Sequence, residues 1–307
     1  MSRTYDLVHR TTYEYDRPVT ESYGATALTP RDLPDQRLLS AALEIDPAPA
    51  DSDAHTDYFG NAARYFAITT DHRRLVVTCR STVEVSRVAP DPAALPQVGW
   101  EDVVAAVRAG DAAACGTGPA GLVRLLEMVL PSRHVRPGDD VRAWAEPSFT
   151  PGRPLVDVVA DLAHRIRHEF TYRTGATTVS TTQAQLLDQR AGVCQDFAHL
   201  AIAALRAHGL PARYASGYLE TRPRPGAPKL RGADASHAWL SAWIPGAGWL
   251  EIDPTNDKLV DDRYVVLGWG RDYDDVPPLR GVIETEGTPA RPQVSVDLVP
   301  AGSDPFV

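Results

Sequence analysis

The 307-residue sequence lacks the marks of a membrane or exported protein. No apolar run approaches the roughly 18 residues that a membrane-spanning helix requires. The first residues carry no apolar segment behind Arg3, so they do not look like a secretory signal. We therefore expect no membrane partner and a cytoplasmic location.

The sequence also lacks an excess of basic residues. Lysine and arginine number 31 against 40 aspartates and glutamates, which gives a formal net charge of −9. A nucleic-acid-binding protein usually carries a basic face, so no nucleic-acid partner is expected. Hydrophobic residues make up 43% and charged residues 23%, which is typical of a globular protein, and the length suffices for two domains.

Cysteine is scarce, with Cys79, Cys115 and Cys194 alone. An odd and sparse set does not make a disulfide framework, and no two of the three have the Cys-x-x-Cys spacing of zinc sites. Cys79 and Cys115 have no candidate base nearby in the sequence, and we expect both to be inert. The set fits the reduced thiols of the cytoplasm.

The first 90 residues predict a β-rich domain. Short β-branched runs favour strands, and residues 57–61 (DYFGN) favour a turn between two of them. A polar and aromatic strand begins at Tyr5 and is expected to end at Pro18. A proline-rich stretch at residues 89–96 marks the domain boundary.

After this linker the apolar period becomes helical. A later helix begins at Cys194 and stops at Gly209, and three strands follow it, with an exposed loop at residues 221–235. Earlier helices are expected at residues 100–107, 122–129 and 154–170. The predicted domains are residues 1–90, a core at 91–280, and a C-terminal extension at 281–307 that is expected to form a strand.

Cys194 occupies a special position at the start of its predicted helix. The unpaired N–H groups and the dipole at a helix N-terminus favour negative charge, and therefore the thiolate, which is the nucleophilic form. A thiol nucleophile also needs a base and a third group that orients the base. His237 and Asp253 are the candidates for these two roles.

The alternation of side chains along strands predicts that His237 and Asp253 meet. Leu240 lies on the apolar face of one strand, and Leu250 on the apolar face of the next. If the two apolar faces share one core, His237 and Asp253 share the opposite face, whereas a slip of one residue would bury Asp253 and expose the leucines. Three further residues share the face of His237 and are candidates for a substrate pocket: Trp239, Ser241 and Trp243.

This register also constrains the turn between the two strands. The residue numbers of two residues that pair across these strands must have an even sum. A symmetric four-residue loop at residues 245–248 would instead pair Ile244 with Trp249, whose numbers have an odd sum. That pairing would place Asp253 on the wrong face. We therefore predict an odd-length loop or a bulge in this hairpin.

Several ordered blocks resemble the bacterial transglutaminase-like family. The core blocks are residues 192–199 (GVCQDFAH), 211–219 (PARYASGYL), 235–239 (ASHAW), 253–256 (DPTN) and 270–276 (GRDYDDV). The N-terminal region is similar to the β-rich domain that precedes this core, through residues 12–13, 18–19, 28–31 and 57–61. The resemblance implies an α+β fold with a papain-like core and a triad of Cys194, His237 and Asp253. Where the family is expected to carry histidine, this sequence has Tyr264, which we expect to alter the substrate rim alone.

The resemblance also implies a function: acyl transfer from the amide bonds of a peptide or protein substrate through a thioester, without a cofactor. Water would complete a hydrolysis and an amine a transamidation, and we favour hydrolysis because a cross-linking enzyme would threaten its cytoplasmic surroundings. One alternative is an inactive binding or scaffold protein on the same fold, which the presence of both Cys194 and His237 disfavours. Another is a metal-dependent hydrolase that uses His164, His168 and nearby carboxylates.

Other polar residues receive structural interpretations. His164 and His168 are four apart on a helix, a spacing that zinc sites use, but no His-Glu-x-x-His pattern accompanies them, so a solvated helix face is favoured over a metal site. Asp196 and His199 are expected to cap the helix or hold a neighbouring loop. Three carboxylates lack the spacing of a calcium loop and are expected to lie on a solvated loop: Asp272, Asp274 and Asp275.

An oxyanion hole needs N–H or O–H donors close to the thiolate. The backbone N–H of Cys194 is the expected first donor. Tyr172 and Gln189 are the candidates for the second donor.

Overall fold

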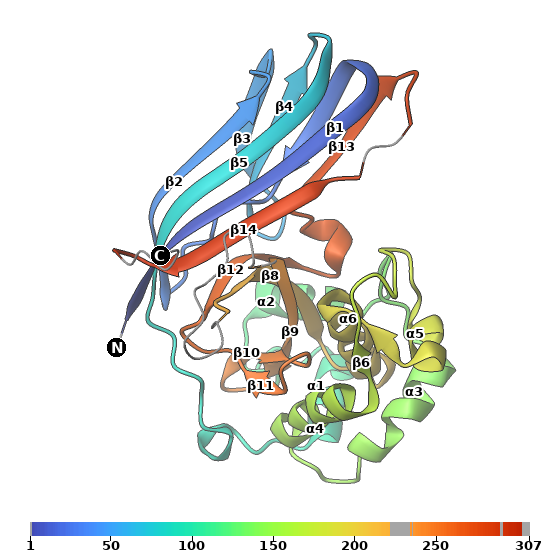
Figure 1. The fold of residues 1–307 in the computed structure, drawn as a ribbon. Helices are drawn as coiled ribbons and strands as arrows, with labels where there is room; N and C mark the ends of the chain where they lie inside the picture. Colours follow the sequence, from blue (N-terminus) through green and yellow to red (C-terminus); the bar gives the residue numbers. More distant parts are fainter. Residues whose placement is uncertain (1, 222–233, 235, 289–290, 303–307) are drawn as a thin grey trace, which may run out of the picture.

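The computed structural model describes residues 2–221, 234, 236–288 and 291–302, and it has the predicted α+β architecture (Figure 1). A curved N-terminal sheet lies over a core in which helices cover one face of a second sheet. Most of the loop expected at residues 221–235 lies outside the described residues. Within the described residues, no helix combines the length and the apolar character needed to cross a membrane.

The N-terminal sheet is antiparallel, and its main path has the order β2-β5-β1-β4-β3. Its strands are β1 (Arg3–Thr26), β2 (Gln36–Asp46), β3 (Asp51–Thr56), β4 (Ala62–Ile68) and β5 (His72–Val85). The predicted turn at residues 57–61 joins β3 to β4, with Gly60 at a positive φ of 80°. The expectation that the first strand ends at Pro18 is wrong, because a register shift between Glu14 and Val19 accommodates the proline and β1 continues to Thr26.

The C-terminal extension forms two strands rather than the one expected. Both β13 (Leu279–Thr285) and β14 (Gln293–Pro300) pair antiparallel with β1 and so complete the N-terminal sheet. The long β1 would otherwise leave backbone N–H and C=O groups unpaired along one edge. The chain therefore returns to its first domain after building the core.

The core contains six α-helices among the described residues. Four of these match predicted helices, while α3 and α5 have seven residues each, which is too short for a recognisable apolar stripe. The helices are α1 (Trp100–Ala109), α2 (Pro119–Glu127), α3 (Asp139–Ala145), α4 (Leu155–Glu169), α5 (Gln183–Gln189) and α6 (Cys194–Ala207), with 3-10 turns η1 (Pro92–Ala94), η2 (Glu146–Ser148) and η3 (Tyr273–Asp275).

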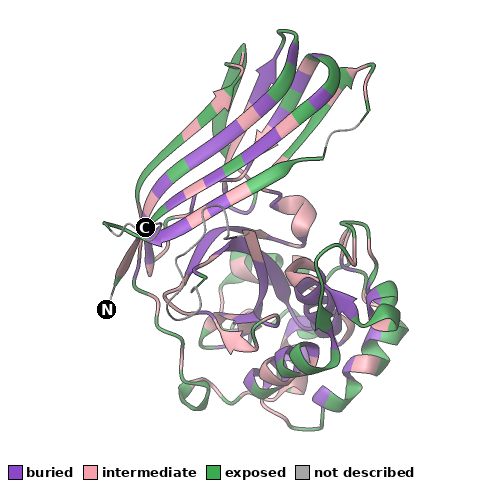
Figure 2. Cartoon of the chain, viewed as in Figure 1, coloured by how far each residue is buried: buried purple, intermediate pink, exposed green. Residues whose placement is uncertain are grey.

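The core sheet has the order β11-β10-β9-β8-β12. Its strands are β8 (Ala212–Leu219), β9 (Ser236–Ile244), β10 (Gly248–Asp253), β11 (Lys258–Leu259) and β12 (Tyr264–Gly270), and a separate parallel pair joins β6 (Thr171–Tyr172) to β7 (Ala191–Gly192). Helix α6 lies against β8 and β9 and is buried nearly all round, because other helices cover its far side (Figure 2). This packing holds the helix start rigidly above the strands.

The edge of the core sheet formed by β8 and β12 packs on the N-terminal sheet. Tyr218 and Val265 belong to the same buried cluster as Tyr5 of β1. The Gln36 side chain adds polar contacts, because its amide donates to the Val266 carbonyl at 2.8 Å and accepts from the Val266 N–H at 2.8 Å. The two sheets therefore share both an apolar core and buried hydrogen bonds.

Candidate active site

The start of α6 places Cys194 at the first helical position. Val193 is the N-cap, and its N–H donates to the Asp196 carboxylate at 2.8 Å, while the Thr177 hydroxyl donates to the same carboxylate at 2.7 Å. Asp196 therefore both caps the helix and holds a loop, in agreement with its predicted role. Gly192 lets the chain pack closely here, because a Cβ there would lie 2.7 Å from the Leu186 side chain and 2.9 Å from the Asp196 carboxylate.

The β9–β10 hairpin has the predicted register. Gly248 pairs with Ile244 across a three-residue loop, and Ile252 pairs with Leu240, so the paired positions sum to an even number. His237 and Asp253 consequently lie on one face, with 2.7 Å between Nε2 and Oδ2. The odd-length loop is the feature that makes this meeting possible.

His237 has a strongly raised pKa. Burial alone lowers the pKa of this imidazole, but the hydrogen bond and charge of Asp253, followed by the interaction with Cys194, raise it to about 10. Because Nε2 is bonded to Asp253, Nδ1 is the nitrogen left to interact with the thiol. His237 is therefore an imidazolium at neutral pH and lies beside Cys194.

Asp253 is fully buried and has five hydrogen-bond donors. Oδ2 accepts from His237 Nε2 at 2.7 Å, from the Tyr264 hydroxyl at 2.8 Å and from Asn256 Nδ2 at 2.6 Å. Oδ1 accepts from the backbone N–H groups of Thr255 at 2.8 Å and Asn256 at 3.3 Å. Burial raises the pKa of this carboxyl, but the bond and charge of His237 and the donors around it lower the pKa by more.

Tyr264 does not lie on a substrate rim, so that expectation is wrong. Its side chain is fully buried beside Asp253, because it packs in a cluster with Trp239, Val260 and Val266. Burial, followed by the charge of Asp253, raises its pKa, so the phenol stays protonated and donates to Oδ2. Its replacement of an expected histidine was the only sequence signal for this position.

A cavity of about 370 Å³ opens beside His237. Tyr172, one oxyanion-hole candidate, lines it, and burial and the charge of Cys194 raise the pKa of this phenol. Gln189, the other candidate, does not line the cavity and donates its side-chain amide to the Ala191 carbonyl at 2.9 Å. The lining residues are Arg167, Phe170, Tyr172, Phe197, Leu219, Thr221, Ser236, His237, Thr255 and Asn256.

The predicted pocket residues Trp239, Ser241 and Trp243 do not line this cavity. Trp239 is fully buried and packs edge-to-face on Tyr264, with 5.4 Å between ring centroids. Ser241 is also fully buried, and its hydroxyl accepts from Arg213 Nε at 3.2 Å, while Trp243 donates to a backbone carbonyl at 2.7 Å. The parity argument placed them on the correct face, but other core residues cover that face.

His199 holds a neighbouring loop, as predicted. Its Nε2 accepts a hydrogen bond from the Tyr273 N–H at 3.2 Å. Burial lowers the pKa of this imidazole to about 3, with the charges of nearby groups acting as smaller effects. The ring is therefore neutral and acts as an acceptor.

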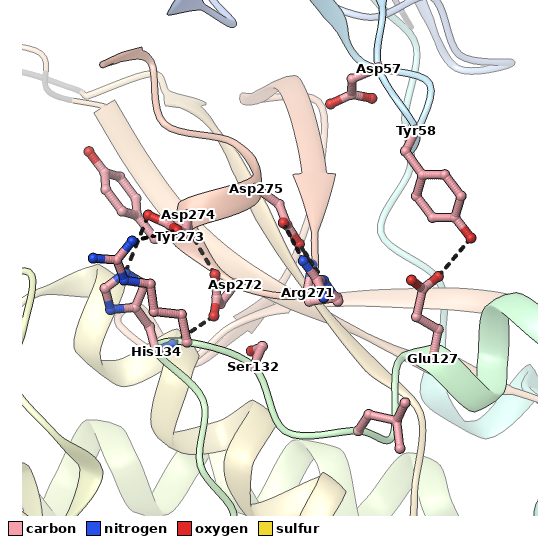
Figure 3. A network of polar contacts seen from close by, with 12 residues as sticks. Asp57, Tyr58, Glu127, Ser132, His134, Arg271, Asp272, Tyr273, Asp274 and Asp275 are labelled. Atoms are coloured by element: carbon pink, nitrogen blue, oxygen red, sulfur yellow. Dashed lines mark hydrogen bonds and ion pairs between the residues drawn. The ribbon is translucent and has the colours of Figure 1, made fainter. Parts of the chain in front are cut away.

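The acidic loop next to it is less solvated than expected, because the Asp274 side chain is 41% exposed but Asp272 and Asp275 are held by protein donors. Figure 3 shows its carboxylates turned toward protein donors. Asp272 is 2% exposed and accepts from the backbone N–H groups of His134 at 2.7 Å and Asp274 at 2.9 Å. Asp275 binds Arg271 through two side-chain contacts of 2.9 Å. These carboxylates tie the loop to the core.

The remaining cysteines are buried. Burial raises the pKa of the Cys79 thiol to about 11 and also raises that of Cys115. Cys194, in contrast, is partly exposed. Elsewhere, His164 and His168 lie on the exposed side of α4, and Asp257 approaches them from the turn after β10.

Two family models match the chain. The model of the bacterial transglutaminase-like N-terminal region matches residues 5–84, and that of the transglutaminase-like superfamily matches residues 140–254. An uncharacterized protein of Mycobacterium tuberculosis (strain H37Rv) is 49% identical over 306 residues, covering 98% of this chain and 94% of the relative. A protein-glutamine gamma-glutamyltransferase of Pseudomonas aeruginosa is 38% identical over 103 residues, covering 32% of this chain and 15% of the relative.

A solved structure shares the fold. The crystal structure of a candidate cysteine protease from Cytophaga hutchinsonii superimposes with a TM-score of 0.75 at 20% identity, covering 100% of this chain and 94% of that one. At this identity the likeness shows the arrangement of sheet and helices and nothing about the reaction.

Proposed function

Because the chain belongs to the bacterial transglutaminase-like family, we propose that it is a cysteine-dependent acyl-transfer enzyme acting on amide bonds. One observation carries the proposal. Cys194 begins α6 beside His237, and the buried Asp253 carboxylate holds that imidazole at 2.7 Å with its pKa raised to about 10. A thiolate beside an imidazolium is the reactive pair of a thiol acyltransferase.

In the first half of the reaction, the Cys194 thiolate attacks the amide carbonyl carbon. The carbonyl oxygen becomes an oxyanion, for which we assign the Cys194 N–H and the Tyr172 hydroxyl as donors. His237 then gives its Nδ1 proton to the leaving nitrogen as the C–N bond breaks. The products of this step are a thioester and a free amine.

In the second half, neutral His237 takes a proton from water or from an acceptor amine. The resulting nucleophile attacks the thioester and the Cys194 thiolate leaves. Attack by water gives a carboxylate product, and attack by an amine gives a new amide. We favour water, and therefore hydrolysis of peptide or isopeptide bonds. A cytoplasmic location is part of the proposal, because the three cysteines are unpaired and the nucleophile must stay reduced.

Thiol reactivity gives the first test. Iodoacetamide at neutral pH should label Cys194 much faster than Cys79, whose pKa burial raises to about 11. Mass spectrometry of the folded protein after brief labelling measures the three rates. Equal rates at all three cysteines would contradict an activated nucleophile.

Acyl trapping tests the reaction itself. A library of glutaminyl and other peptide amides should leave an acyl mass on Cys194 and on no other residue, and Cys194→Ala should trap none. Free ammonia, a cleaved peptide or an incorporated fluorescent amine then separates the possible outcomes. Rapid labelling of Cys194 without any trapped acyl group or turnover would favour the inactive scaffold.

A further inference from the structure

Two histidines and an aspartate meet on the exposed side of α4. His164 and His168 are one helical turn apart, and their ring centroids lie 4.0 Å apart. Asp257 is 93 positions from His164 in the sequence, yet its Oδ2 lies 2.8 Å from His164 Nδ1. One possible ligand atom from each of the three residues lies within 4.8 Å of the others.

The two imidazoles offer a ligand atom in different ways. His164 Nδ1 lies 2.8 Å from Asp257 Oδ2, and an ion bound by both residues would replace the proton between these atoms. His168 Nδ1 donates to the His164 carbonyl at 2.8 Å, a backbone partner that leaves the Nε2 lone pair of His168 for a ligand. Metal-binding histidines usually have such a partner on one ring nitrogen, because it sets the tautomer and the direction of the other.

The backbone directs Asp257 toward the helix. Asp257 has a φ of 51°, and within the described residues only Arg190 shares a positive φ among residues other than glycine. Such a conformation persists when the surrounding structure holds it in place. Here the preceding residues hold it, because the Thr255 N–H and the Asn256 side chain are both bonded to Asp253.

We propose that His164, His168 and Asp257 form a binding site for one divalent transition-metal ion of the zinc class. Imidazole and carboxylate donors suit such ions, and the exposed His164 leaves room for water ligands. The ion joins α4 to the turn that holds Asp253. Two chain neighbours of the proposed ligands, Arg167 and Asn256, line the cavity beside His237.

The test must separate this site from the thiol, since a thiolate beside an imidazole also binds zinc and cobalt. We therefore use the full-length Cys194→Ala protein and titrate it with Co²⁺, whose absorption spectrum reports imidazole and carboxylate ligation. We expect one equivalent to bind and the melting temperature to rise with Co²⁺ concentration. The outcome is independent of the proposed acyl transfer, because the nucleophile is absent.

Variants in the same background locate the ion. His168→Gln should abolish the cobalt spectrum and the thermal shift, and Asp257→Asn should weaken binding by about 10- to 100-fold. His55→Gln, on the exposed strand β3, is the matched control and should bind like the parent. Unchanged binding by the folded His168→Gln variant, or no binding to the Cys194→Ala parent at millimolar Co²⁺, would overturn the proposal.

Discussion

Two histidines of the core, the largely buried His237 and the buried His199, have opposite electrostatic environments. Burial lowers the pKa of both imidazoles. For His237 the direct contact with Asp253 outweighs burial and the pKa rises to about 10, whereas the pKa of His199 falls to about 3. The same side chain is therefore a cation at one site and a neutral ring at the other.

The partner atoms explain the difference. His237 Nε2 faces a carboxylate oxygen at 2.7 Å, which stabilises the protonated ring. His199 Nε2 instead accepts a backbone N–H at 3.2 Å, which requires that nitrogen to be unprotonated. The charge of Asp272 raises the pKa of His199, but less than burial lowers it. Burial of a histidine is therefore no sign of a catalytic base until its partner is known.

The largest expected effect comes from removing each histidine in turn. His237→Gln should lower kcat/KM on a substrate identified by trapping by about 10⁴-fold or more, because it removes the base and the proton donor. His199→Gln should keep turnover but lower the free energy of unfolding by about 1–3 kcal/mol, since the Tyr273 N–H loses its buried acceptor. Steady-state kinetics and denaturant unfolding measure the two effects, and equal kinetic losses would contradict the assigned roles.

The second prediction concerns the carboxylate that separates the two environments. Asp253→Asn removes the charge that raises the pKa of His237, so that pKa should fall and kcat/KM should drop by about 10²- to 10⁴-fold. NMR titration of His237 in the folded variant measures the pKa. Asp272→Asn, near His199, is the control and should leave the rate unchanged. A His237 pKa that stays near 10 in Asp253→Asn would contradict the assignment.

The third prediction concerns pH. Between about pH 6.5 and about pH 3, unfolded His199 binds a proton and native His199 does not, so its contribution to stability falls as pH falls. His237 has a raised pKa, so its contribution is full below about pH 6.5 and is lost as pH rises toward about 10. The two histidines therefore act in opposite directions.

The contribution of His199 is measured by the free energy of unfolding of the parent and of His199→Gln between about pH 7 and about pH 5. The slopes of this free energy against pH should differ by up to about 1.4 kcal/mol per pH unit. His9, whose pKa burial lowers to about 4, contributes equally to both proteins and cancels. Parallel pH curves for the two proteins would show that His199 is not held neutral.

The contact between His237 and Asp253 was predictable because their placement follows from local rules. The helix start at Cys194 follows from its apolar period. Strand alternation, once the two apolar faces share one core, places His237 and Asp253 on one face and requires an odd-length loop or a bulge, and the structure has the odd-length loop. The rules for the helix start and for strand alternation act over a few residues, and the second holds wherever an apolar core sets the register. The long loops and short helices around them carry no comparable period.

What lies around the triad depended on packing between distant segments. Trp239 sits on the predicted face, but alternation does not say that Tyr264 and Val260 pack around it, so its predicted place in a pocket was wrong. The approach of Asp257 to His164 joins positions 93 residues apart. The sequence likewise predicted one C-terminal strand where the structure has two, because their pairing partner β1 lies at the other end of the chain.

The smallest expected effect belongs to Tyr264, which touches the triad without taking part in proton transfer. Tyr264→Phe removes one of the three donors on Asp253 Oδ2 and leaves His237 and Asn256 in place. The free energy of unfolding should fall by about 1–3 kcal/mol, because a buried carboxylate loses a hydrogen bond. Loss of kcat/KM should stay below about ten-fold, since the carboxylate keeps its charge and its bond to the imidazole.

Tyr264→His supplies the matched control, because an imidazole at this position can also donate to Asp253. If the lost hydrogen bond causes the destabilisation of Tyr264→Phe, Tyr264→His should recover most of the lost free energy of unfolding. Denaturant unfolding and kcat/KM for both variants separate the two contributions. A loss of kcat/KM by Tyr264→Phe as large as that of Asp253→Asn would make Tyr264 part of the catalytic unit itself, and the contrast between a charged His237 and a neutral His199 would then depend on the phenol as well as on the carboxylate.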